Sequence, residues 1–142
     1  MANVQAFPSQ AKVEFMLGTH VLGTDTIKAA LYLATGSQGA ATTAYSATNE
    51  VSGTNYTAGG VTVTTATAPT LNGTEADFTP SASIVYTTVT LSTAFDCVTL
   101  YNSTKSNKAI GVFTFGSQTI TAGTLTLTMP ANTAGNALIR IA

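Results

Sequence analysis

Side chains able to do acid–base or nucleophilic chemistry are scarce in this sequence, which holds one histidine, one cysteine and six carboxylates in 142 residues. His20 and Asp25 share one short segment, and a serine hydroxyl would complete the residue types of a hydrolytic triad. No sequence pattern places a serine on the sharp turn that such a nucleophile occupies. We therefore expect His20 to hydrogen-bond within its own turn or to meet a neighbouring subunit. Neither catalytic residues nor enzymatic activity is predicted.

The same scarcity argues against a metal or cofactor site. Zinc sites take three or four His, Cys or carboxylate ligands, and one histidine with one cysteine is too few. Calcium would draw on carboxylates and loop carbonyls, but no Asp-rich loop has the required spacing. Glu75 and Asp77 lie two residues apart on one strand face, where they would hold a weakly bound ion or, in the interpretation that we favour, form a solvated hairpin face. The carboxylates considered for calcium are Asp25, Glu50, Glu75, Asp77 and Asp96.

Charged residues make up only 8% of the chain, against about 25% in typical globular proteins. Threonine occurs 29 times, and its branched side chain favours strands. A weakly charged, hydroxyl-rich surface suits wide contacts with neighbouring subunits, because few ions lose water when it is covered. It does not suit nucleic acid, since phosphate binding needs a clustered positive patch. The five basic residues are scattered: Lys12, Lys28, Lys105, Lys108 and Arg140.

Cys97 has no second cysteine to pair with, and its neighbours Phe95, Val98 and Leu100 predict a small buried hydrophobe. No run of 18 apolar residues is present, and the first ten residues lack the basic start and apolar stretch of a signal peptide. We expect one domain over residues 1–142, made in the cytoplasm and not associated with a membrane.

Helical spacing is evident only near the N-terminus. Residues 9–17 are predicted to form a helix that Pro8 begins and Gly18 ends. The nearly continuous apolar run at 26–34 predicts a central strand. From 35 to 60 the chain is rich in Gly, Ser, Ala, Thr and Asn, so a long flexible loop is expected, ordered in part by neighbours.

The remainder predicts short strands. Residues 61–68 alternate and 75–79 return after the Asn72-Gly73 turn signal, which indicates a hairpin. Strands 95–101 and 109–115 are expected to pair across a polar loop at 102–108. Together these segments predict an all-β fold, an antiparallel β-sandwich or jelly roll of about eight strands with one short N-terminal helix. The other predicted strands are 83–92, 118–121, 124–129 and 137–141.

Four sequence segments carry a family resemblance: GTHVLGTDTIKAAL at 18–31, NEVSG at 49–53, YTAGGV at 56–61 and LIRIA at 138–142. In this order they resemble a family of small structural proteins from the virions of tailed bacteriophages. The centre of the chain matches only by strand pattern. The resemblance implies a virion component without enzymatic activity or catalytic residues.

The leading hypothesis is a capsid decoration, or cement, protein on the virion head. Its copies would form a homotrimer that clamps adjacent major capsid subunits or contacts other virion proteins. The alternative is a tail fibre, tail-tip or vertex domain that binds host glycan, for which Tyr45 and Tyr56 would lie exposed together. A hydrolase would instead require His20 near a carboxylate and a hydroxyl in a cleft. The residues expected to contact other subunits are Val13, Phe15, Met16, Leu17, Tyr45 and Tyr56.

Overall fold

The computed structural model describes residues 2–64 and 68–142, and it confirms an antiparallel all-β fold with one short α-helix. A single 3₁₀ turn, η1 (Ser103–Lys105), separates the two longest strands. Among the described residues, no helix has the length and apolar character needed to span a bilayer. The helix and strands are α1 (Ser9–Met16), β1 (Ile27–Leu33), β2 (Val61–Thr62), β3 (Thr70–Asn72), β4 (Glu75–Phe78), β5 (Ile84–Asn102), β6 (Lys108–Leu127) and β7 (Ile139–Ile141).

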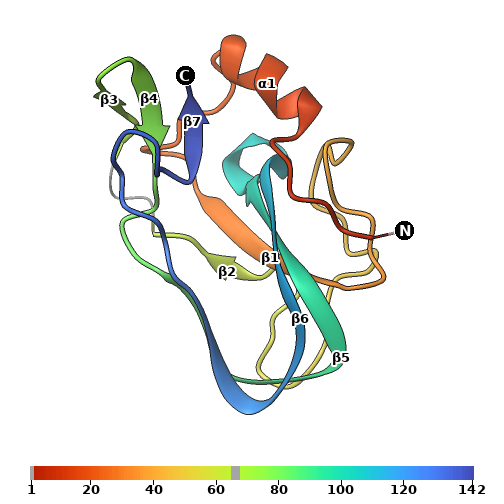
Figure 1. Ribbon diagram of the computed structural model, residues 1–142. Coiled ribbons are helices and arrows are strands. Elements are labelled where there is room, and N and C mark those ends of the chain that lie inside the picture. The colour runs from red at the N-terminus through yellow and green to blue at the C-terminus, as the bar shows by residue number, and fades with distance from the viewer. Residues whose placement is uncertain (1, 65–67) are drawn as a thin grey trace.

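The strands form two sheets, with the orders β2-β1-β5-β6 and β3-β4-β7 (Figure 1). β1 lies between two neighbours, as its apolar sequence predicts, and Ala29 to Tyr32 are all fully buried. β5 pairs with β6 across residues 103–107, which confirms the pairing expected across the polar loop. The core therefore centres on β1 and the hairpin formed by β5 and β6.

β5 and β6 are longer than the sequence pattern predicts. The segments 83–92 and 95–101 are one continuous strand of 19 residues, and 109–115, 118–121 and 124–129 are represented by one strand of 20 residues that ends at Leu127. The register shifts at several points along the pair, between Tyr86 and Phe95 among others. Such irregularities bend a strand without ending it. Figure 1 shows the hairpin curving at its lower end, so that both strands turn back toward the β3-β4-β7 sheet.

The predicted hairpin has its turn in the expected place but a different first strand. Gly73 has a φ of +66° and joins β3 to β4, which confirms the Asn72-Gly73 turn. β2 instead pairs with β1, and the strand that pairs with β4 across the turn is β3. Residues 65–67 of the expected strand lie outside the described part of the chain. The strand expected at 137–141 is β7, which pairs with β4.

α1 begins at Ser9 as predicted, with Pro8 as its N-terminal cap residue, and ends at Met16, one residue earlier than expected. Gly18, with a φ of +69°, follows the helix, and the amide of Thr19 donates to the carbonyl of Glu14 at 2.9 Å. This is the Schellman arrangement for ending a helix. The helix buries Ala11 and Glu14, whereas Met16 is 89% exposed and Leu17 is 75% exposed.

The segment between β1 and β2 forms no named helix or strand, as expected, yet its own chain holds it in place. Isolated backbone bridges join Glu50 to Tyr32, Ala44 to Lys108 and Thr54 to Thr90. The long loop is present, and isolated bridges tie it to β1, β5 and β6 of its own chain. Its anchors lie within the chain, because the loop supplies tyrosines and a glutamate that reach the core.

Candidate functional site

Two polar clusters hold the one histidine and three of the six carboxylates, and the first centres on Glu50. The Tyr45 hydroxyl donates to Glu50 Oε2 at 2.7 Å, and the Tyr56 hydroxyl donates to Oε1 at 2.8 Å. The amide of Gly59 also donates to Oε1, at 2.7 Å. We call these four residues the Glu50 network. Its carboxylate therefore binds three residues of one loop, from Tyr45 to Gly59, which span fifteen positions of the chain.

Each tyrosine of the Glu50 network stacks on a second tyrosine from the β5 strand. Tyr45 stacks on Tyr101 with ring centroids 4.8 Å apart, and Tyr56 stacks on Tyr86 at 6.0 Å. Burial and the bond to Glu50 raise the pKa of Tyr45 to about 12. Burial likewise raises the pKa values of Tyr56 and Tyr86. Tyr45 and Tyr56 are thus half-buried anchors and do not form an open aromatic platform.

At two positions of the same segment the backbone lies so close to a carbonyl of a neighbouring strand that only glycine fits. A Cβ on Gly53 would lie 2.0 Å from the carbonyl oxygen of Thr90. A Cβ on Gly60 would lie 1.6 Å from the carbonyl oxygen of Ala29, and Gly60 has a φ of +71°. Together with the Glu50 network, these contacts give a structural role to the segment 49–61 that carries part of the family resemblance.

The second cluster, the His20 network, consists of Glu14, His20, Asp25, Asn102 and Lys108. His20 Nε2 lies 3.1 Å from Glu14 Oε2, and Nδ1 lies 3.1 Å from Asn102 Nδ2. Asn102 Nδ2 also donates to Asp25 Oδ2 at 2.7 Å. The Lys108 ammonium donates to Glu14 Oε1. α1, the following loop and the turn end of the hairpin meet at this point.

Both carboxylates of the His20 network are almost fully buried, with Glu14 only 3% exposed. Burial raises the pKa of Glu14, but hydrogen bonds from Lys108, His20 and Gln10 outweigh this effect and hold the pKa below its ordinary value. Burial also opposes ionisation of Asp25, whose pKa is nevertheless lowered by bonds from the Val21 amide and from Asn102. Both groups are therefore ionised at neutral pH.

His20 was expected to hydrogen-bond within its own turn, but its two hydrogen-bond partners lie in other elements, Glu14 in α1 and Asn102 at the end of β5. Among the described residues, no serine or threonine hydroxyl hydrogen-bonds to His20, and both of its ring nitrogens already have partners. Cys97 is fully buried as predicted, and burial raises its pKa to about 12. This geometry supplies no activated nucleophile at either residue.

The two carboxylates of the β3-β4 hairpin, Glu75 and Asp77, do not form the solvated face that was expected. Asp77 is fully buried and is not part of a solvated face. Its Oδ2 accepts from Asn72 Nδ2 at 2.9 Å, while Glu75 Oε2 lies 3.4 Å from Arg140 Nη1. Within the described part of the chain, no three His, Cys, Asp or Glu side chains gather as metal ligands.

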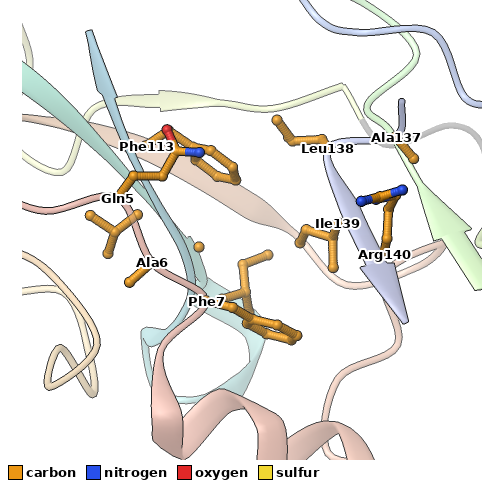
Figure 2. Close-up of a pocket in the computed structure, with 11 residues that line it drawn as sticks. Gln5, Ala6, Phe7, Phe113, Ala137, Leu138, Ile139 and Arg140 are labelled. Atoms are coloured by element: carbon orange, nitrogen blue, oxygen red, sulfur yellow. The ribbon is translucent and has the colours of Figure 1, made fainter. Parts of the chain in front are cut away.

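Exposed apolar residues gather where α1 meets the C-terminal strand. A cleft of about 320 Å³ lies between residues 5–7 and β7, and Figure 2 shows Phe7 and Ile139 on its opposite walls. An adjoining cavity of about 450 Å³, which we call the α1 groove, shares Phe7 and Arg140 with it. The groove is lined by Phe7, Lys12, Phe15, Met16, Arg140, Ile141 and Ala142.

The residues expected to contact other subunits fall in two places. Val13, Phe15, Met16 and Leu17 belong to α1 and its end, whereas Tyr45 and Tyr56 belong to the Glu50 network. Sequence reasoning missed Glu14, Asn102 and Lys108, because a charged helix residue and a polar loop are usually solvated. The available signal was a lone histidine close to a glutamate on one side and an aspartate on the other.

Comparison of the chain with models of protein families, with curated proteins and with solved structures found no match.

Proposed function

We propose that this chain is a structural virion protein of a tailed bacteriophage, and specifically a capsid decoration protein that clamps neighbouring major capsid subunits on the head. The observation that carries the proposal is the apolar face of α1. Met16 and Leu17 project into solvent, and Ile141 of β7 is 54% exposed beside the same groove. An apolar surface of this kind is typical of a contact with another protein.

Two further properties support a contact role. Only 8% of the residues are charged, so covering the surface removes few ions from water. The residues at 49–61 that carry part of the resemblance serve the fold, which agrees with a family that lacks catalytic residues.

Stabilisation of a shell would be additive. One interface of standard size, about 1,600 Å² in total, contributes several kcal/mol after the costs of association, and a capsid repeats it many times. A homotrimer around a three-fold position would also cover sheet edges, since β6 and β7 each end a sheet. Multi-angle light scattering of the 14.4 kDa chain tests this oligomeric state.

The alternative, a tail fibre, tail-tip or vertex domain that binds glycan, has weaker support. Sugar sites favour exposed aromatic rings, and the hydroxyls of Tyr45 and Tyr56 both donate to Glu50 inside the chain.

Quantitative mass spectrometry of purified virions tests the proposal. About one copy per major capsid subunit is expected, because only the shell lattice offers so many equivalent positions. A ratio of a few per cent would assign the chain to a tail or vertex, and its absence from virions would refute a structural role.

A matched pair of variants tests the surface itself. Leu17→Asp should lower the copy number in virions, because it places a charge on the α1 face. Leu71→Asp is the control, since Leu71 is equally exposed, at 77%, but lies on β3. Equal incorporation of both variants would exclude the α1 face as the contact.

A further inference from the structure

We propose that the His20 network is an acid-operated latch that fastens α1 to the turn end of the β5-β6 hairpin, and that protonation of His20 releases the helix. The latch is a property of the isolated chain, so it does not depend on the proposed function. It rests on the hydrogen-bonding pattern around one buried imidazole.

Only one protonation state of His20 satisfies this pattern. Asn102 Oδ1 accepts from the amide of Lys105 at 3.2 Å, which directs the Asn102 NH₂ group toward His20 and Asp25. His20 Nδ1 must therefore accept a hydrogen bond. Nε2 then carries the proton and donates to Glu14 Oε2. This is the neutral imidazole.

Protonation would place a hydrogen on Nδ1, facing the NH₂ group of Asn102. Two donors would then point at each other in a buried site, and a hydrogen bond would be lost without replacement. Asn102 cannot rotate its oxygen toward His20 without giving up the bonds to Lys105 and Asp25. Asn102 is itself fully buried, so water cannot substitute for the missing partner.

Four charged groups surround His20, and they act in opposite directions. Glu14 from α1 and Asp25 from the following loop favour the charged imidazolium, whereas Lys108 from β6 opposes it. Lys105 of η1 lies 3.9 Å from Asp25 Oδ1 and partly offsets that carboxylate. Burial is the largest effect, and it holds the pKa of His20 below its ordinary value of 6.5.

α1 is the element that this change would release. Of its residues only Ala11 and Glu14 are buried, and Phe15 is half-buried against Phe7 and His20, so α1 is attached largely through side chains that contact His20. A helix of eight residues is not stable alone in water. The imidazolium keeps its Nε2–H bond to Glu14, so the contact that protonation breaks is the one between His20 and Asn102. The loop that carries His20, and α1 with it, should therefore open locally while the two sheets remain folded.

Amide hydrogen exchange followed by NMR between pH 7.5 and 5.0 tests the latch. After correction for the intrinsic pH dependence of exchange, the opening equilibrium of α1 should rise by up to about thirtyfold between pH 7.5 and 5.0, the factor expected when His20 has its ordinary pKa of 6.5 in the open state and stays neutral in the closed state. The amides of β1 and β5 should keep their protection. Parallel loss of protection in α1 and the strands would indicate global unfolding and would overturn the proposal.

His20→Gln is the matched variant, because the glutamine NH₂ group can donate to Glu14, its carbonyl oxygen can accept from Asn102, and the side chain does not titrate in this range. Its α1 exchange should not change with pH, and a response equal to that of the native chain would refute the latch. If the variant does not fold, the native chain still decides. The α1 amide shifts must titrate with the same midpoint as the His20 ring, and below 6.5; a separate or higher midpoint would rule the latch out.

Discussion

Glu50 connects parts of a long segment that forms no helix or named strand. Its two oxygens accept three hydrogen bonds, from Tyr45, Tyr56 and Gly59. Tyr56 in turn accepts from the amide of Leu31 in the central strand, at 3.0 Å. The carboxylate thus links the loop to β1, and its loss would leave several donors without a partner.

Glu50→Ala is expected to lower the free energy of unfolding by about 2–4 kcal/mol, because three half-buried donors lose their acceptor. Urea unfolding followed by circular dichroism measures the change. Glu75→Ala is the control, since its ion pair with Arg140 is partly exposed and should contribute less than about 1 kcal/mol. Equal losses in the two variants would show that Glu50 has no special role.

The contact between Gly60 and Ala29 predicts a second large effect. Gly60→Ala should cost more than about 3 kcal/mol, because the new Cβ would overlap the Ala29 carbonyl. Gly73→Ala is matched to it: its φ is also positive, at +66°, but nothing lies within 4 Å of the added atom. That variant should cost only about 1–2 kcal/mol of backbone strain. Similar unfolding midpoints for both would contradict the close contact.

Among the elements, those marked by turn residues or by a continuous apolar run were predictable from the sequence. Gly18 ends α1, Asn72-Gly73 joins β3 to β4, and the apolar run at 26–34 is the central strand. The continuity of β5 and β6 was not predictable, because small and polar residues near Ser92 and Gly116 resemble turns. Only pairing with the partner strand keeps them extended.

Because the first half of β5 is one extended strand, buried and exposed side chains should alternate from Ile84 to Leu91. Leu91→Ala should cost about 2–5 kcal/mol, because Leu91 is buried in the main core. Val85→Ala, on the same strand, should cost less than about 1 kcal/mol, since Val85 is 42% exposed. Thermal unfolding of both variants checks the pattern, and a reversed order would mean that the strand has another register.

For the whole molecule, the sequence predicted an all-β chain but neither polar network. The bonds of the His20 network join residues up to 94 positions apart, and no local pattern encodes such a meeting. The Glu50 network is closer in sequence, yet its tyrosines looked like isolated anchors in a polar loop. In both cases burial is decided by packing, which one sequence does not reveal.

The buried tyrosines predict that the molecule loses stability in alkali. The pKa of Tyr45 is raised from 10.0 to about 12, and burial also raises those of Tyr56 and Tyr86. A folded-state pKa above the unfolded value gives stability that is present below pH 10 and is lost as pH rises through the folded-state value. Unfolding in urea at increasing pH should show this loss. Gradual tyrosine ionisation near pH 10 in a fully folded chain, seen by ultraviolet absorbance, would contradict it.

The long β5-β6 hairpin also sets an order of folding. Residues 103–107 alone separate its strands, so its first pairs form at a small loop-closure cost, whereas β7 must find β4 far upstream in the chain. The hairpin should therefore assemble early and serve as the surface on which β1 docks, and the β3-β4-β7 sheet should close last. Substitutions near the hairpin turn should then slow folding, and those in β7 should mainly speed unfolding.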